Sequence, residues 1–292
     1  MNKPLCSIKI IFVWLFLLLA PQPFLVGNIA KNNASCFVLR PGYPNAGLFA
    51  TCHRVLRLLE CYKLGWCSGI EVDFSNEGCY YDKKLGNNWW NYYFEPIKYG
   101  STTPKKEIRK NIRFMQPGPS AILVPHKRIK WYVKNYIIPK KHIQQKVDAF
   151  ISREFKNHFM IGVHYRGTDK ITSHEAKRIS YEKVRYIVQQ VITKRQNNTT
   201  DYRLFIATDE QAFLNFMIQS FGTKVCFNPN VIRSTTDKPL HQNHKMQSPY
   251  ASGEGAVVDC LLLSKTNFLI RTKSNLSQWA TFFNQKIPCI CL

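Results

Sequence analysis

Hydrophobic and polar positions change their period several times between residues 36 and 74. Residues 36–40 form a short apolar run that predicts a buried strand. Apolar side chains then recur at helical spacing up to Gly65, at Leu48, Cys52, Val55, Leu56, Leu59 and Tyr62. Residues 70–74 alternate apolar and acidic side chains, which predicts a second strand. A strand, a helix and a strand in this order predict a βαβ unit.

The same alternation returns in the second half of the chain. Short apolar runs predict strands at residues 159–164, 204–207, 225–227 and 268–270. Apolar positions at helical spacing predict helices at residues 180–195, 210–221, 254–264 and 274–283. Strands that alternate with helices form parallel sheets with helices on both faces. The fold class predicted from this pattern is therefore α/β.

The two alternating regions are separated by residues of a different kind. Residues 78–99 are aromatic and irregular, which is typical of a packed loop. Residues 104–146 contain twelve basic residues, one acidic residue and several prolines. Chains longer than about 250 residues tend to divide into domains. We therefore predict two domains, residues 28–146 and residues 147–292, with a junction at about residues 140–147.

The first 27 residues have the pattern of a targeting segment. Lys3 and Lys9 precede eleven apolar residues at positions 10–20. This run is short for a membrane-spanning helix and typical of a signal peptide, although a signal anchor stays open. We expect a protein that is exported or membrane-associated through residues 1–27, in the Golgi lumen if the source is eukaryotic. The rest of the chain has no apolar stretch of this kind, which excludes a polytopic membrane protein.

Charge adds a second hypothesis. The chain has 41 Lys and Arg against 18 Asp and Glu, a formal charge of +23. Residues 127–146 interleave many of these cations with Trp131, Tyr132 and Tyr136. Such a stretch is either a solvated face or a binding surface for nucleic acid, anionic lipid or anionic glycan. The leader argues against nucleic acid, so the non-enzyme alternative is a protein that binds polyanions or membrane surfaces.

Ten cysteines leave two interpretations open. Cys6 lies in the leader, and the other nine are an odd number. An extracytoplasmic location would permit disulfides among the five at positions 36–79, while small buried side chains are an equally simple interpretation. None of the spacings is C-x-x-C, so we predict no zinc site.

Ligands of open α/β sheets bind at the carboxyl ends of the strands, so the residues that follow each strand carry the candidate chemistry. Arg166 follows the strand at 159–164; its planar fork suits a phosphate, and a surface pair with Asp169 is the alternative. Thr208 and Asp209 follow the next strand, where a helix N-cap is the favoured interpretation. Residues 272–275 begin the last helix, and such a helix start is an anion site.

These strand ends carry motifs that resemble a known family. The matching segments are residues 164–170 (HYRGTDK), 205–210 (FIATDE) and 259–279, with 47–49 (GLF), 71–73 (EVD) and 94–96 (FEP) in the first half. Their order resembles fucosyltransferases of the nodulation-factor and N-glycan core α1,6 types and, more loosely, protein O-fucosyltransferases. The resemblance implies a GT-B-like fold, in which two Rossmann-like domains face each other across a cleft. It also implies that residues 28–146 form the acceptor side.

The resemblance implies GDP-fucose as the donor substrate, bound by the second domain. Arg166 falls at the position of the family's arginine on the donor diphosphate. His164 and Asp259 fall at positions that hold the guanine. Ser274 and Asn275 fall at the phosphate-binding turn.

Two positions depart from the pattern of the N-glycan core enzymes. Gly167 stands where those enzymes carry a second arginine. Glu175 matches their catalytic base only if one residue is inserted near His174, so Asp169 and His174 are further candidates.

The resemblance implies inverting transfer of fucose to a glycan, α1,6-like in linkage. No Asp-x-Asp occurs in the sequence, and the acidic pair at 71 and 73 lies in a first-domain strand. We therefore predict catalysis without a metal or a cofactor. Transfer of another GDP-sugar and protein O-fucosylation are the alternatives, and the acceptor is open among chitooligosaccharide, N-glycan core, protein hydroxyl and bacterial surface glycan.

Overall fold

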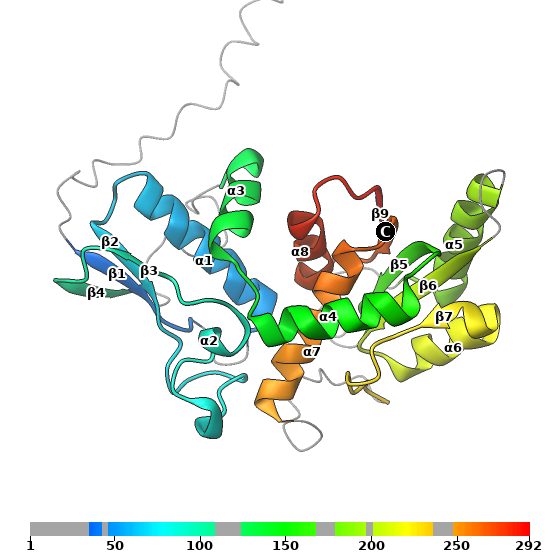
Figure 1. The fold of residues 1–292 in the computed structure, drawn as a ribbon, viewed down its shortest axis with the longest axis horizontal. Helices are drawn as coiled ribbons and strands as arrows, with labels where there is room; N and C mark the ends of the chain where they lie inside the picture. Colours follow the sequence, from blue (N-terminus) through cyan, green and yellow to red (C-terminus); the bar gives the residue numbers. More distant parts are fainter. Residues whose placement is uncertain (1–34, 43–45, 109–123, 168–178, 197–200, 236–247) are drawn as a thin grey trace, which may run out of the picture.

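The computed structural model describes residues 35–42, 46–108, 124–167, 179–196, 201–235 and 248–292. Their strands form two separate sheets, one of four strands and one of five. Figure 1 shows the sheets at opposite ends of the molecule, with helices between them. None of the helices in these ranges is long and apolar enough to cross a membrane. The predicted leader at residues 1–27 lies outside the described residues.

The first sheet has the order β3-β2-β1-β4. Strands β1 (Cys36–Leu39), β2 (Gly69–Val72) and β4 (Lys105–Ile108) are parallel, and α1 (Leu48–Lys63) connects the first two. The predicted βαβ unit is therefore confirmed. β3 (Lys98–Gly100) runs antiparallel to β2, which departs from the all-parallel prediction. Only short helical turns, η1 (Lys83–Leu85) and α2 (Trp90–Tyr93), lie between these two strands.

The second sheet has the order β7-β6-β5-β8-β9, and every pair in it is parallel. Its strands are β5 (Phe159–Tyr165), β6 (Tyr202–Thr208), β7 (Val225–Cys226), β8 (Phe268–Arg271) and β9 (Cys289–Cys291). Its helices are α5 (Tyr181–Gln196), α6 (Gln211–Phe221), α7 (Pro249–Ser264) and α8 (Asn275–Phe283). A 3₁₀ turn, η3 (Gly222–Lys224), follows α6. The predicted α/β class is confirmed, and β9 is the one strand of this sheet that the apolar pattern did not indicate.

The basic stretch between the two sheets contains two helices, α3 (His126–Tyr136) and α4 (Lys141–Glu154). α4 buries Ile143, Val147 and Phe150 and packs on α7. These residues recur at helical spacing, so the stretch is more regular than its charge and prolines indicate. The predicted division between residues 146 and 147 falls inside α4.

The aromatic segment before β3 joins the two halves. Trp89, Trp90, Tyr93 and Phe94 are almost fully buried, which confirms that this segment is packed. The Tyr93 ring stacks on Tyr250 of α7 at 5.7 Å, and its hydroxyl donates to the Tyr250 carbonyl at 3.0 Å. One apolar core therefore runs from the first sheet into α7 and α8.

The nine described cysteines are free thiols in this structure. Seven are buried, which agrees with their interpretation as small core residues, and Cys289 and Cys291 are exposed on β9. Burial raises the pKa of Cys67 to about 12, so its thiol is unreactive at neutral pH.

Candidate active site

Two of the predicted anion-binding features meet at the carboxyl edge of the second sheet. Arg166 directly follows β5, and its backbone N–H donates to the Thr272 hydroxyl at 2.9 Å. The Thr272 N–H donates to the carbonyl of His164 at 3.1 Å. β5 and β8 are neighbouring parallel strands, so their carboxyl ends lie at the same edge. The loop after β5 is thereby held against the segment that leads into α8.

Asp209 is the partner that the structure gives to Arg166. A guanidinium nitrogen of Arg166 lies 3.1 Å from the Asp209 carboxylate, and the Gly167 N–H donates to the same carboxylate at 3.3 Å. The favoured prediction of a helix N-cap for Asp209 is wrong, because α6 has Glu210 as its N-cap residue and no side chain caps it. About a quarter of the Arg166 side chain is exposed, at 23%. A ligand at this edge can therefore still reach the guanidinium.

The start of α8 follows Thr272, the residue that binds the Arg166 backbone, after two positions in the sequence. Ser274 has extended backbone and makes no side-chain capping hydrogen bond, and Asn275 is the first residue of the helix and is exposed. The Ser277 hydroxyl instead donates to the Thr272 carbonyl at 3.1 Å. A helix start carries unpaired N–H groups and the positive end of the dipole. The predicted phosphate-binding turn therefore begins at Ser274, two residues after Thr272, whose hydroxyl accepts the Arg166 backbone N–H.

His164 and Asp259, the predicted guanine residues, are both buried. His164 lies in β5 and is 5% exposed, and Asp259 lies in α7 and is 4% exposed. The Asn228 amide donates to the Asp259 carboxylate at 3.1 Å. Burial raises the pKa of Asp259 to about 7, while Arg233 and the Asn228 hydrogen bond oppose the rise.

Asn228 and Arg233 belong to the loop after β7, where the sequence shows no recognisable spacing. The Arg233 guanidinium donates to the carbonyls of Val231 at 2.9 Å and Asn228 at 3.1 Å and lies 4.9 Å from the centre of the Phe227 ring. The sequence pattern does not indicate Asn228 or Arg233, because their position depends on Asp259, which is far away in the chain. Together they form a buried polar wall around that carboxyl group.

Backbone hydrogen bonds attach this wall to the Arg166 pair. The Ser234 N–H donates to the Asp209 carbonyl at 2.7 Å, and the Gln211 N–H donates to the Ser234 carbonyl at 3.0 Å. The loop after β7 is therefore tied to the end of β6. The Arg166 pair and the Asp259 wall therefore lie along the carboxyl edge of the same sheet.

The first domain contributes Tyr80, which lies in the segment between β2 and η1. Its hydroxyl accepts the N–H of Leu48, the first residue of α1, at 2.9 Å. Burial raises the pKa of Tyr80 well above its ordinary value, and the Arg166 guanidinium partly offsets the rise. An electrostatic interaction of this kind requires the two side chains to be near each other. Tyr80 therefore brings the first domain within electrostatic reach of Arg166.

The structure also shows what occupies the space beside Gly167. A Cβ atom at this position would lie 2.0 Å from a carboxylate oxygen of Glu210. Glu210 is buried and accepts a hydrogen bond from the Tyr181 hydroxyl at 2.6 Å. A second arginine at position 167 would require Glu210 to move.

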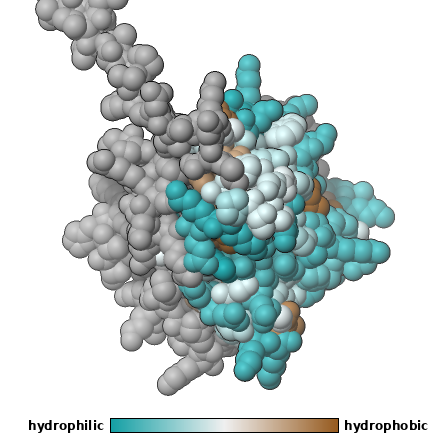
Figure 2. Space-filling view, turned by 90° about the vertical axis from the view of Figure 1, so that its left-hand side faces the viewer, coloured by the Kyte–Doolittle hydropathy of each residue, from teal (hydrophilic) through white to brown (hydrophobic). Residues whose placement is uncertain are grey.

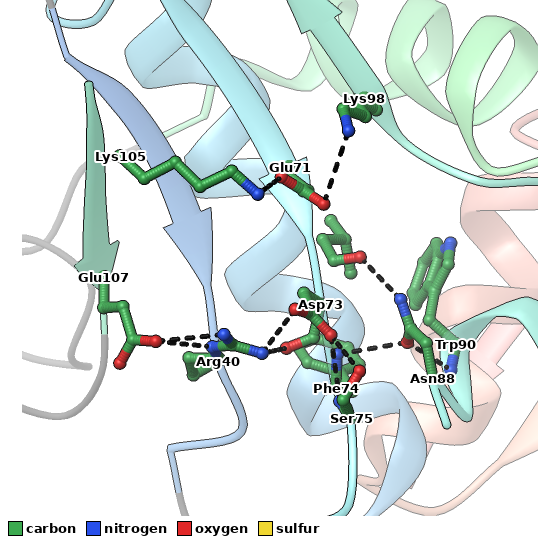
Figure 3. Close-up of polar contacts among 11 residues, drawn as sticks. Arg40, Glu71, Asp73, Phe74, Ser75, Asn88, Trp90, Lys98, Lys105 and Glu107 are labelled. Atoms are coloured by element: carbon green, nitrogen blue, oxygen red, sulfur yellow. Dashed lines mark hydrogen bonds and ion pairs between the residues drawn. The ribbon is translucent and has the colours of Figure 1, made fainter. Parts of the chain in front are cut away.

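The acidic pair of the first sheet is engaged with basic side chains, as Figure 3 shows. Glu71 forms ion pairs with Lys105 at 2.8 Å and with Lys98 at 3.8 Å. Asp73 pairs with Arg40 and accepts from Ser75. Within the described ranges, no three His, Cys, Asp or Glu side chains gather as metal ligands would. Glu175, Asp169 and His174 lie outside the described residues.

Two α/β halves and a candidate anion site at the carboxyl edge of the second sheet are typical of a GT-B-type glycosyltransferase. The family model of nodulation protein Z (NodZ) matches residues 126–289, more than half of the chain. The chain belongs to the NodZ family, and it is a fucosyltransferase by family. The resemblance and the GT-B-like fold predicted from the sequence motifs are confirmed.

Solved structures agree with this fold. NodZ α-1,6-fucosyltransferase co-crystallised with GDP superposes with a TM-score of 0.51 at 17% identity, over 85% of this chain and 92% of that chain. Fucosyltransferase NodZ from Bradyrhizobium gives 0.50 at 17% identity over 85% and 92%. POFUT1 in complex with GDP gives 0.52 at 10% identity over 90% and 99%. No curated protein matches the sequence. At these sequence identities the structural similarity shows the fold alone.

Proposed function

We propose that this chain transfers fucose from GDP-fucose to a glycan hydroxyl group, with inversion and without a metal, in the manner of an α1,6-fucosyltransferase. The observation that carries the proposal is the setting of Arg166, which lies between Asp209 and Thr272 at the edge of the second sheet. NodZ has been co-crystallised with GDP and soaked with GDP-fucose, and POFUT1 has been solved with GDP. These ligands support the donor that the sequence motifs imply.

The donor would lie along the carboxyl edge of the second sheet. Arg166 and the α8 start at Ser274 and Asn275 would hold the diphosphate, because both present N–H donors to anionic oxygens. His164 and Asp259 would hold the guanine. The N–H donors on the guanine edge match a carboxylate, and they would replace part of the solvation that burial removes from Asp259.

The reaction then needs one base and one charge receptor. Glu175 would take the proton of the acceptor hydroxyl as that oxygen bonds to the anomeric carbon of fucose. The bond from the anomeric carbon to the diphosphate breaks on the opposite side, and its electron pair leaves with GDP. Arg166 would stabilise the charge that develops on the diphosphate. Asp209 is a positioning residue, because it fixes the guanidinium without contacting the reacting atoms.

Metal independence is part of the proposal. Many transferases that use nucleotide sugars neutralise the leaving diphosphate with a cation bound by paired carboxylates. In this chain the nearest such pair, Glu71 and Asp73, is already engaged with Lys105 and Arg40. Arg166 and the α8 start supply the positive charge at the second sheet instead.

Consumption of sugar nucleotides by the purified full chain tests the proposal. GDP-fucose should be hydrolysed slowly without an acceptor, and GDP-mannose and UDP-galactose should be consumed much more slowly. The rate on GDP-fucose should be the same with and without a chelator. Equal rates on GDP-mannose would assign another GDP-sugar as the donor. Loss of activity on chelation would contradict the metal-free mechanism, and no consumption of any sugar nucleotide would contradict the transferase.

A further inference from the structure

A cluster of partly exposed aromatic rings lies on the first domain, on α3 and β3. Trp131 of α3 and Tyr99 of β3 are exposed at 46% and 39%. The Tyr136 ring lies between them, 5.4 Å from Trp131 and 5.0 Å from Tyr99. Large aromatic side chains exposed side by side are unusual on a surface that contacts only water. The cluster is therefore a candidate interaction surface.

Lysines surround these rings. Lys63 lies with its ammonium 6.0 Å from the centre of the Trp131 ring. Lys130 and Lys134 are exposed one helical turn apart on either side of Trp131 in the sequence. Helix α3 contains no acidic residue. Within the described part of the chain, none of these three lysines pairs with a carboxylate. We call Lys63, Tyr99, Lys130, Trp131, Lys134 and Tyr136 the basic-aromatic face.

A buried polar anchor fixes α3 beneath this face. Glu60 of α1 is 1% exposed; it accepts from the Tyr132 hydroxyl at 2.8 Å and lies 2.5 Å from the Arg128 guanidinium. A buried carboxylate with two partners of this kind specifies one orientation of the two helices. The rings and lysines are therefore presented on a rigid support.

The chain enters the first domain beside this face. Ser35 is the first described residue, and its carbonyl accepts the N–H of Ser68, five residues after Lys63. Gly69 begins β2 and is paired with Gly100, the neighbour of Tyr99. Residues 1–34, with their apolar run at 10–20, are thus joined to the domain at the end where the basic-aromatic face lies.

We propose that the basic-aromatic face binds the surface of a membrane that contains anionic lipids. Trp and Tyr rings settle at the level of lipid headgroups, and lysines near the surface are attracted by anionic phosphates. A neutral glycan would need no such excess of cations. The part of the first-sheet end that Figure 2 colours is mostly hydrophilic, which suits contact with headgroups rather than insertion.

Binding through the basic-aromatic face would orient the protein relative to the membrane. The basic-aromatic face lies near the amino ends of β1 and β2, where Ser35 enters. Arg40 and Asp73 follow the carboxyl ends of the same two strands. A first domain held at its amino edge would keep its carboxyl edge directed away from the bilayer, open to an acceptor.

Hydrogen exchange of the full chain in lipid nanodiscs tests the proposal. The two disc types are phosphatidylcholine alone and phosphatidylcholine with phosphatidylglycerol. The same full chain, with any leader, is used with both disc types, so a difference in exchange between them reports on binding to anionic lipid. Peptides that cover α3 and β3 should exchange several-fold more slowly in the anionic discs, and high salt should remove the difference.

Charge-reversal variants identify the responsible residues. Lys130→Glu with Lys134→Glu should abolish the extra protection, since each lysine near an anionic surface contributes roughly fivefold to binding. Lys183→Glu with Lys194→Glu, two exposed lysines of α5, is the matched control and should retain it. Equal protection in both disc types, or equal behaviour of the two double variants, would overturn the proposal. Binding of single-stranded DNA or heparin, sensitive to the α3 variant, with no response to anionic discs would also overturn it in favour of a soluble polyanion.

Discussion

Each sheet of this protein has an arginine directly after a strand that is paired on both sides, and the two arginines have different surroundings. Arg40 follows β1, which lies between β2 and β4, and Arg166 follows β5, which lies between β6 and β8. Arg40 is paired with two carboxylates, Asp73 and Glu107. Arg166 is paired with one described carboxylate, Asp209, and its backbone is bound to Thr272.

This difference shows how the same position in a sheet can serve structure or ligand binding. Two carboxylates around Arg40 leave a net negative group, which does not attract a diphosphate. At Arg166 the described ion pair is the one with Asp209, and the positive α8 start follows Thr272, whose hydroxyl binds the Arg166 backbone. The neighbours of each arginine, rather than the arginine itself, are therefore the basis of our proposal that the donor binds at the second sheet.

The largest effect is expected at Glu175, where the rate of transfer should fall while the affinity for GDP stays unchanged. Glu175→Gln should lower the rate of fucose transfer by about 10²-fold or more, because the acceptor proton loses its base. GDP affinity should stay near that of the wild type. Single-turnover transfer and GDP calorimetry on the same preparation measure both quantities, with Glu182→Gln on α5 as a control. Normal transfer by Glu175→Gln would move the base to Asp169 or His174.

Replacement of Arg166 by lysine tests whether the fork of donors matters or only the charge. Arg166→Lys should lower the transfer rate by on the order of 10²-fold, because one ammonium cannot pair two diphosphate oxygens. Arg40→Lys, the same change at the other sheet, should leave donor hydrolysis nearly unchanged. Near-normal turnover of Arg166→Lys at equal folded fraction would show that a simple charge suffices.

We predict that Asp259 makes GDP binding depend on pH. The free protein holds this carboxyl with its pKa raised to about 7, and in the proposed donor site guanine binds the ionised form. GDP affinity should therefore fall about tenfold for each pH unit below about 7, with proton release on binding. Asp259→Asn should remove this dependence and weaken GDP by roughly tenfold or more at about pH 8. Calorimetry at several pH values measures both, and an unchanged pH dependence in the variant would contradict the role of Asp259.

The same shift predicts an effect on stability of the free protein. The folded pKa is above the unfolded value of about 4, so between about pH 4 and pH 7 the unfolded state loses this proton first. Asp259 therefore lowers the free energy of unfolding as pH rises through that window. Asp259→Asn should unfold at a higher temperature than the wild type at about pH 8, and the gain should vanish at about pH 4.

The smallest expected effect concerns Asp209. Asp209→Asn keeps the shape of the side chain and removes its charge, so Arg166 loses its alignment but remains present. GDP affinity should fall by about fivefold, the usual value of one hydrogen bond of this type. Asp73→Asn makes the equivalent change beside Arg40 and should leave GDP affinity unchanged. A similar loss in both variants would indicate a general effect of charge.

The sequence pattern predicts the second sheet better than the middle of the chain, for a physical reason. β5, β6, α5 and α8 bury regular apolar faces, and their predicted bounds agree within a few residues. α3 and α4 present most of their surface to solvent, so lysines and prolines obscure the helical spacing of Ile143, Val147 and Phe150. α7 begins at Pro249, with Ser248 as its cap, because Pro at the first turn starts a helix rather than breaking it.

Local signals are also ambiguous at the candidate site. Arg166 and the α8 start could be predicted, because strand ends and helix starts are visible in the sequence. Asp209 precedes a helix and resembles a cap, yet its carboxylate contacts a residue 43 positions earlier. Asn228 and Tyr80 acquire their positions only from tertiary contacts, and no local pattern indicates them.

Calorimetric titration of GDP into three proteins measures whether the donor binds at the second sheet: the wild type, Arg166→Ala and Arg40→Ala. We expect Arg166→Ala to weaken GDP binding by at least about tenfold, since a charge-assisted pair to the diphosphate is lost. We expect Arg40→Ala to stay within about twofold of the wild type, since that arginine serves the first sheet alone. Equal weakening by both substitutions, or unchanged binding by Arg166→Ala with the fold intact, would contradict the assignment of the donor site to the second sheet.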